Sequence, residues 1–226
     1  MAFNYSPKIV TNGLVLCLDA SNVKSYVSGS TSWNDLTSNQ NIGVLTNGPT
    51  FNSSNGGSIV FDGSNDYVKL PNSSIFQLSN FTFNAWVKTS LTNTNQFIID
   101  CSSNFSAGYG YSLRITSGNK IRFWSYDATY YLDSITTVST NTWYNITSTY
   151  DNTSGVQKIY INGILDLSNT AAGFAISTIS YLQIGSAQIF GMYLGGNISY
   201  IQFYNRALSS TEILQNYNAT KTRFGL

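Results

Sequence analysis

Histidine is absent from this sequence of 226 residues, and glutamate occurs only once, as Glu212. Without an imidazole, neither a Ser-His-Asp nor a Cys-His catalytic arrangement can form, and the usual nitrogen ligand of zinc is missing. Paired carboxylates for acid–base catalysis are not apparent either, because the nine aspartates are scattered along the chain. The nearest two with aromatic neighbours, Asp127 and Asp133, stand among residues typical of turns. We therefore expect that the protein is not an enzyme.

Cysteine, net charge and long apolar segments are scarce as well. Cys17 and Cys101 are the only cysteines, and two thiols in a chain without a secretory signal are more often free than bridged. The net charge is +1 with no basic cluster, which argues against binding to nucleic acid or to an anionic membrane. The longest apolar run near the start, residues 14–18, is too short to span a bilayer, and no basic segment with a long apolar region precedes it. We expect neither a membrane span nor a signal peptide.

Uncharged polar residues and aromatic residues dominate instead. Asn, Ser and Thr together number 81, against 21 charged residues, while Trp, Tyr and Phe number 4, 16 and 13. Such a chain can cover sheet faces with hydroxyls and amides, and its aromatic rings supply core volume. Because the length fits one β-sandwich, we interpret residues 1–226 as a single domain, with an N-terminal arm at 1–8 and a C-terminal tail at 220–226.

Short apolar segments separated by turn residues indicate an all-β fold. The first strand is expected at residues 14–18, with Leu14, Leu16 and Leu18 facing the core, and residues 20–57 are expected to be long loops. The dense strand signals further along the chain predict a sandwich of two antiparallel sheets. Further strands are expected at 59–61, 67–70, 81–88, 97–100, 111–116, 121–126, 144–150, 158–165 and 182–185, with turns at 117–119 and 162–163.

The C-terminal segment, residues 196–219, combines a strand with a helix. Its first part alternates in apolar character, and the spacing becomes helical after Asn205 and Arg206. Ser209 and Glu212 have the spacing of a capping box, which gives the single glutamate a structural role. We therefore expect one short helix at the end of an otherwise all-β domain.

Seven motifs occur in the order and spacing of one fold family. They are YSPKIVTNGLVLCLDASN at 5–22, TSWNDL at 31–36, FDGSNDYVKL at 61–70, FTFNAWVK at 81–88, WYNITSTYD at 143–151, KIYINGIL at 158–165 and the segment 196–219. Through them the chain resembles the laminin-G-like and pentraxin-like families, and its opening block resembles small stand-alone proteins of tailed bacteriophages. The resemblance implies a concanavalin A-like jelly-roll sandwich of two antiparallel sheets with one short C-terminal helix. It leaves the function open, because this fold serves lectins, glycan-binding modules, adhesion domains, glycoside hydrolases and virion accessory proteins.

The resemblance also raises the question of calcium. Pentraxin-like members hold the ion with a loop aligned with residues 64–66 and with an acidic loop aligned with residues 186–188, which carry no acid here. Asp62, Asn65 and Asp66 remain as candidate metal ligands, whereas calcium takes about six to eight oxygen ligands. The alternative is an Asx-rich turn that stabilises its own backbone. We favour the turn, expect no cofactor and disfavour calcium.

Aromatic residues alternate along the strand expected at 121–126. If Ile121 and Phe123 face the core, the residues between them form an outer platform, and flat aromatic rings flanked by hydrogen-bonding groups suit the binding of sugars. The alternative is that these aromatic residues cover an outer sheet face or pack under a loop. The candidate glycan-binding residues are Arg122, Trp124, Tyr126 and Tyr130.

The loop before the last strand, residues 184–196, is more apolar than the corresponding loop in the families that the chain resembles. A strand continuing through it would bury only alternate residues, so the remaining apolar side chains are candidates for contact with a partner subunit. The alternative is that the loop belongs to the core. The candidate interface residues are Ile189, Phe190, Met192 and Tyr193, together with Tyr5 and Phe224.

These observations lead to two hypotheses of function. The first is a non-enzymatic virion accessory protein of a tailed phage, a capsid decoration or tail-fibre-associated protein that is made in the host cytoplasm and docks on capsid or tail subunits or on itself. The second is a lectin-like, carbohydrate-binding module that recognises cell-surface glycans. Binding to particles distinguishes the first from the second, which requires binding to a glycan.

Overall fold

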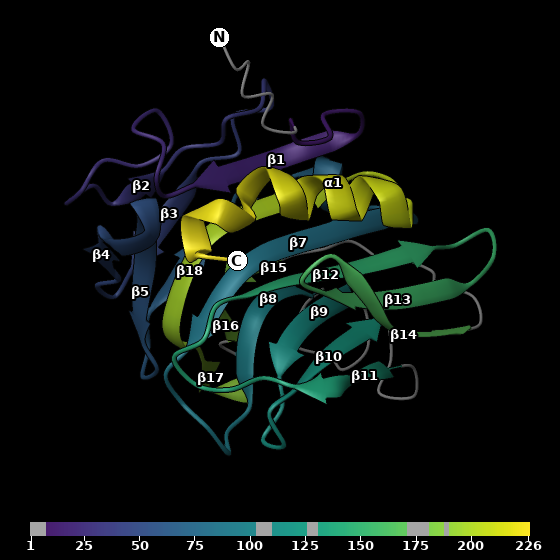
Figure 1. The fold of residues 1–226 in the computed structure, drawn as a ribbon. Coiled ribbons are helices and arrows are strands. Elements are labelled where there is room, and N and C mark those ends of the chain that lie inside the picture. The colour runs from purple at the N-terminus through teal and green to yellow at the C-terminus, as the bar shows by residue number, and fades with distance from the viewer. Residues whose placement is uncertain (1–7, 103–109, 126–130, 171–180, 188–189) are drawn as a thin grey trace, which may run out of the picture.

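The computed structural model describes residues 8–102, 110–125, 131–170, 181–187 and 190–226, which form a sandwich of two large antiparallel sheets (Figure 1). Sheet A contains, in order across the sheet, β14 (Ile164–Thr170), β13 (Val156–Ile161), β12 (Tyr144–Asp151), β7 (Phe81–Thr89), β18 (Gly195–Tyr204), β5 (Ser58–Asp62) and β4 (Thr50–Asn52), and β1 (Leu14–Asp19) also pairs with β18. Sheet B contains β11 (Tyr131–Thr137), β10 (Lys120–Ser125), β9 (Gly110–Ile115), β8 (Gln96–Ser102), β15 (Tyr181–Ile184), β6 (Tyr67–Lys69), β3 (Gly43–Thr46) and β2 (Ser32–Trp33). The short strands β16 (Ser186–Ala187) and β17 (Met192–Tyr193) pair with each other.

Helical segments are short and lie between or after the strands. Among the described residues they are the 3₁₀ turns η1 (Ser54–Gly56), η2 (Ser74–Phe76) and η4 (Lys221–Phe224) and the α-helix α1 (Ser210–Thr220). None of the helices described is long and apolar enough to cross a membrane. The expected sandwich of two antiparallel sheets with one short C-terminal α-helix is thus confirmed.

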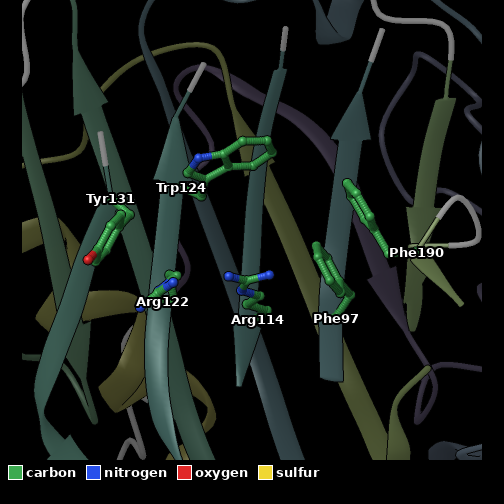
Figure 2. Close-up of a pocket in the computed structure, with 6 residues that line it drawn as sticks. All are labelled: Phe97, Arg114, Arg122, Trp124, Tyr131 and Phe190. Carbon is green, nitrogen blue, oxygen red and sulfur yellow. The ribbon is translucent and has the colours of Figure 1, made fainter. Parts of the chain in front are cut away.

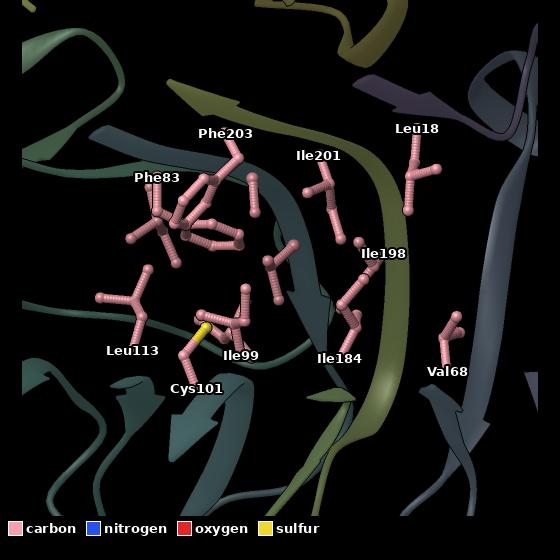
Figure 3. Close-up of a cluster of buried hydrophobic side chains, with 14 of the residues drawn as sticks. Leu18, Val68, Phe83, Ile99, Cys101, Leu113, Ile184, Ile198, Ile201 and Phe203 are labelled. Carbon is pink, nitrogen blue, oxygen red and sulfur yellow. The ribbon is translucent and has the colours of Figure 1, made fainter. Parts of the chain in front are cut away.

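The main core lies between the two sheets and is built from alternate side chains of their strands (Figure 3). Aromatic rings from both sheets meet there: Phe81 of β7 stacks on Tyr111 of β9 with ring centroids 4.3 Å apart. Tyr111 also lies 5.6 Å from Phe203 of β18, and its hydroxyl donates a hydrogen bond to the carbonyl of Phe76. The buried phenol therefore has its polar atom satisfied, as burial requires.

Strand β1 contains a bulge that changes the predicted side-chain directions. Its pairing with β18 shifts register between Leu14 and Leu16. Leu16 and Leu18 face the core as expected, and Val15 joins them, whereas Leu14 packs against clusters outside this core. The expectation for Leu14 was wrong because the extra residue of a bulge breaks the period of two.

Both cysteines are buried free thiols, as their number and the sequence context suggested. Cys101 lies in the core between the sheets, and Cys17 lies on the outer side of sheet A, where its thiol donates to the Tyr200 hydroxyl. Burial raises the pKa of Cys17 to about 12, so neither its position nor its ionisation favours reactivity.

Three short strands occupy part of residues 20–57, where only loops were expected. β2 and β3 extend one edge of sheet B, and β4 extends sheet A. They have two, four and three residues, too few alternating positions for a periodic pattern to show. Trp33 in β2 is fully buried, so this part of the chain contributes to the core.

Two further differences concern the strands after residue 130. β11 was not expected, because only Leu132 and Ser134 of its seven residues are buried and the apolar pattern is weak. The segment at 158–165 is a hairpin of β13 and β14 rather than one strand. Its turn at Asn162 and Gly163 is the predicted one, and both residues have the positive φ that such a turn requires, 53° and 77°.

The outer face of sheet A is covered by the C-terminal elements (Figure 1). The predicted capping box at the start of α1 is confirmed: the Glu212 amide donates to Ser209 Oγ, and the Ser209 amide donates to Glu212 Oε2. After α1, the predicted tail forms η4 and folds back on sheet A, where Phe224 is buried against Trp86 with ring centroids 3.9 Å apart.

Candidate functional site

Strands β8 to β11 direct some side chains into the core and others to the outer face of sheet B. In β10, Ile121 and Phe123 are buried in the core, which confirms the predicted orientation of this strand. Arg122 and Trp124 therefore face outward, and both are half-buried. A pocket of about 170 Å³ lies on this face (Figure 2). It is lined by Phe97, Arg114, Arg122, Trp124, Tyr131 and Phe190.

The register of the strands arranges these residues in two cross-strand rows. In one row, Arg114 of β9 lies opposite Phe97 of β8 on one side and opposite Arg122 of β10 on the other, and Asp133 of β11 comes next. In the neighbouring row, Trp124 lies opposite Tyr131. Figure 2 shows the two guanidinium groups between Tyr131 on one side and the rings of Phe97 and Phe190 on the other.

Arg122 is held by its neighbours on β11. Its Nε and Nη2 atoms donate to the two carboxylate oxygens of Asp133, each at 2.6 Å, and its guanidinium lies 3.9 Å from the centroid of the Tyr131 ring. This bidentate pair raises the pKa of Arg122. The expectation that Asp133 sits in a turn was wrong, since it lies in β11 and fixes the fork of Arg122. Asp127, the other aspartate expected in a turn, lies outside the described residues.

Arg114 differs from Arg122 in the partners of its guanidinium group. Its side chain is half-buried and lies over the Phe97 ring, 5.4 Å from the centroid. Its Nε atom is buried and has no hydrogen-bond partner in the described part of the chain. Burial lowers the pKa of Arg114, and the charge of Arg122 adds to this effect. Within that part of the chain, the pocket thus contains one guanidinium with an acid partner and one without a hydrogen-bonded acceptor.

Phe190 connects the two sets of residues that the sequence kept apart. It was a candidate for a partner interface, and its ring stacks on Phe97 at 6.2 Å and lines the same pocket as Trp124. It is 49% exposed, while Met192 and Tyr193 of β17 are half-buried. Phe224, another interface candidate, is the last residue of η4 and is buried, because its aromatic ring packs on Trp86 of β7 and on Trp143, the residue before β12.

Four of the predicted site residues lie outside the described residues. They are Tyr5, Tyr126, Tyr130 and Ile189.

Three pocket residues were not among the predicted ligands, namely Phe97, Arg114 and Tyr131. A signal for Arg114 was present, because the turn at 117–119 fixes the hairpin register and places Arg114 opposite Arg122. Phe97 gave no such signal, since a bulge between Phe97 and Ile99 interrupts the alternation of β8.

The candidate calcium residues form a turn whose acids bind their own backbone. Asp62 accepts hydrogen bonds from the amides of Ser64 and Asn65, at 2.8 and 3.3 Å, and Asp66 accepts one from the Asp62 amide at 3.0 Å. The bond from Ser64 contributes most to lowering the pKa of Asp62, whereas burial raises that of Asp66. No cluster of three acidic, cysteine or histidine side chains suited to a metal occurs within the described ranges. The acids of this turn thus have backbone amides of the same turn as partners.

A larger hollow of about 550 Å³ lies between the loops around β3 and β4. Tyr26 and Phe51 contribute rings to it, and its other lining residues are small, polar or aliphatic and carry no charge. The smaller pocket on sheet B combines aromatic rings with two guanidinium groups, which makes it the better candidate for specific recognition.

Comparisons with solved structures agree with this architecture. Trypanosoma rangeli sialidase superposes with a TM-score of 0.72 at 17% identity, over 95% of this chain and 34% of that one. The receptor-binding domain of botulinum neurotoxin type G gives 0.66 at 22% identity, over 92% of this chain and 51% of that one. Domain 4 of a GH43 extracellular arabinanase from Geobacillus stearothermophilus, in complex with arabinotriose, gives 0.70 at 17% identity, over 90% and 98%. At such identities the likeness concerns the fold.

The chain spans about a third of the sialidase chain and about half of the chain of the toxin's receptor-binding domain, but nearly the whole arabinanase domain. No curated protein sequence matches it significantly. A family model matches residues 62–214, more than half of the chain, and it runs from the Asp62 turn to α1. The chain therefore belongs to the concanavalin A-like lectin/glucanases superfamily.

Proposed function

We propose that this chain is a non-catalytic carbohydrate-binding module that holds a saccharide in the pocket on the outer face of sheet B. The observation that carries the proposal is the presence of Trp124 and Tyr131 beside two guanidinium groups in one hollow. Aromatic rings offer apolar faces to a sugar, and guanidinium groups donate hydrogen bonds to its oxygens. The arabinanase domain of the same fold, solved with arabinotriose, supports a saccharide as the ligand.

The size of the pocket limits what it encloses. Its volume of about 170 Å³ is below the range of about 300–1,000 Å³ typical of sites that enclose a drug-sized ligand. We therefore expect the pocket to hold one unit of a glycan while the rest of the glycan lies across the sheet. Such contacts give low affinity for a single site.

The carboxylates at the pocket support binding rather than catalysis. Asp133 has both carboxylate oxygens engaged by Arg122, so neither oxygen is placed to exchange a proton with a substrate. Glu212 lies in the cap of α1 and forms an ion pair with Arg206. The absence of enzymatic activity remains part of the proposal.

The virion setting is a separate proposal that rests on the sequence resemblance to phage proteins. A glycan-binding pocket suits attachment to a cell surface. The predicted docking surface has less support, because Phe224 is buried and Phe190 packs on Phe97. We therefore propose attachment to host glycans, rather than capsid docking, as the role on a particle. Labelling of purified particles with an antibody against this protein checks the setting, and particles without label would contradict it.

The binding function is tested with a glycan array followed by calorimetric titration of the best saccharide. Trp124→Ala is expected to weaken binding at least about tenfold, because it removes the largest ring of the pocket. Ile164→Ala is the matched control, since Ile164 is 70% exposed on β14 of the other sheet. Failure of every saccharide to bind, or equal affinity of the Trp124→Ala variant, would overturn the proposal.

A further inference from the structure

Two arginines lie directly opposite each other in the pocket. Arg114 of β9 and Arg122 of β10 are cross-strand partners, and their side chains share the outer face of sheet B (Figure 2). Like charges in this position repel each other and destabilise a strand pair. The arrangement therefore needs negative charge nearby, from the protein or from a ligand.

Among the described residues, only Arg122 of these two arginines forms hydrogen bonds with an acidic side chain. Asp133 is the next residue after Arg122 in the row and binds it through two parallel hydrogen bonds. Such a bidentate pair uses both carboxylate oxygens. Because those oxygens are engaged by Arg122, Asp133 interacts with Arg114 only through its negative charge.

Arg114 has no comparable partner in the part of the chain that the structure describes. Asp100 and Asp133 are near enough to favour its charged form, yet among the described residues neither accepts a hydrogen bond from it. Its guanidinium instead lies over the Phe97 ring, and its buried Nε atom has no acceptor among the described residues. A guanidinium carries five N–H groups and stays charged, so partial burial without acceptors costs free energy.

We propose that Arg114 binds the oxyanion of an acidic saccharide, a carboxylate or a sulfate group, in this pocket. This inference rests on the proposed carbohydrate-binding function. The planar fork of a guanidinium matches two oxygens of such a group, and the added negative charge relieves the repulsion between Arg114 and Arg122. Trp124 and Tyr131 then contact the ring of the same sugar. A neutral saccharide leaves the charge of Arg114 without an acceptor of matching charge.

The experiment compares saccharides that differ only in their acidic group. The probes are sialylated oligosaccharides with their asialo counterparts, oligogalacturonates with their methyl esters, and sulfated galactosides with the unsulfated sugars. Titration of the intact chain is expected to give at least about tenfold tighter binding to the acidic member of one pair. The pair that shows the preference identifies the oxyanion as carboxylate or sulfate.

Variants of Arg114 assign the preference to this side chain. Arg114→Gln is expected to abolish the preference and leave the weaker binding of the neutral sugar, while Arg114→Lys keeps the charge and retains only part of it. Lys24→Gln is the charge-matched control, since it removes one positive charge from an exposed loop between β1 and β2. Circular dichroism and melting establish that each variant is folded. If Arg114→Gln does not fold, Arg114→Lys provides the test: a reduced acidic preference supports the inference, and an unchanged preference contradicts it.

The outcomes separate this inference from the proposed function. Equal binding of acidic and neutral members by the unaltered chain would overturn the inference and leave the carbohydrate-binding function intact. An acidic preference that survives in both Arg114 variants would also overturn it, because another group would then hold the oxyanion. Binding of none of the probes, together with a blank glycan array, would overturn the proposed function itself.

Discussion

The outer faces of both sheets carry tryptophan and arginine side chains, but these side chains differ in their burial and in their partners. On sheet A, Trp86 is fully buried: it stacks on Phe224 and Tyr217, and its indole N–H donates to Thr220. On sheet B, Trp124 is half-buried and its cross-strand partner Tyr131 is 45% exposed. The C-terminal elements α1 and η4 account for the difference, because they pack on the outer face of sheet A. Trp86 is therefore part of the packing between sheet A and its C-terminal elements, whereas Trp124 lies half-buried in the pocket on sheet B.

The arginines of the two faces show the same contrast. Arg206 on the α1 side pairs with Glu212 at 2.6 Å, and Arg223 pairs with Asp19 at 3.1 Å. On sheet B, Arg122 pairs with Asp133, while within the described ranges Arg114 has ring contact and more distant acids. Composition alone does not distinguish these arginines, and the register of the strands does. Arg114 is therefore the residue on which an acidic ligand depends.

The contrast between the two faces would fail if their tryptophans responded alike to truncation. Trp86→Ala is expected to lower the free energy of unfolding by about 3–5 kcal/mol, because it removes a fully buried indole and the surface on which η4 packs. Urea denaturation followed by circular dichroism measures the loss. A loss below about 1 kcal/mol would show that the C-terminal cover contributes little to stability.

Trp124→Ala is the matched variant on the other face. We expect a loss of about 1 kcal/mol or less, since the side chain is only half-buried, whereas that of Trp86 is fully buried. The same denaturation measures it. An unfolded Trp124→Ala protein would mean that this indole is part of the core, and the binding pocket would then have to be reassigned.

The ion pair on the α1 side gives a smaller, pH-dependent effect. Arg206 lowers the pKa of Glu212 to about 2 from an ordinary value of 4.5, so its contribution is present above pH 4.5 and is lost as the pH falls toward 2. Glu212→Gln keeps the capping geometry and removes the charge. It is expected to cost about 0.5–1 kcal/mol at pH 7, because the pair is partly exposed.

The pH series provides its own control for this variant. The difference in unfolding free energy between the parent and Glu212→Gln should shrink between pH 5 and pH 2, since the parent loses the charge there. Denaturation curves at each pH measure it. A difference that stays constant would assign the effect to packing of the cap instead of the ion pair.

Much of the fold could be predicted from the sequence, because local chemistry determines it. The turn at Asn162 and Gly163 requires positive φ, and the spacing of Ser209 and Glu212 specifies a cap. The alternation of Ile121 and Phe123 placed Trp124 outside with the correct orientation. Each of these features depends on residues within one turn or one strand.

The rest of the site depends on contacts between distant segments. Phe190 reaches Phe97 across 93 positions of the chain, and bulges in β1 and β8 interrupt the alternation on which the predictions relied. The burial of Phe224 results from the way η4 folds back on Trp86. Neither effect has a signal in a single segment, so the sequence assigned Phe190 and Phe224 to one docking surface that the structure divides.

The smallest expected effect concerns the turn at residues 62–66, which joins β5 of sheet A to β6 of sheet B. If a tight calcium ion held the two sheets together there, its removal would lower the melting temperature by about ten degrees. Asp62 and Asp66 instead bind amides of their own turn, and Ser186 and Ala187, in the aligned second loop, are buried and uncharged. We therefore expect excess EDTA to change the melting temperature by only about one or two degrees, as measured by differential scanning calorimetry. Readdition of calcium should then have no further effect, with magnesium as the control for ionic strength. A large drop in melting temperature that calcium alone reverses would show that a bound ion in this turn, and not only the apolar core, holds sheet A and sheet B together.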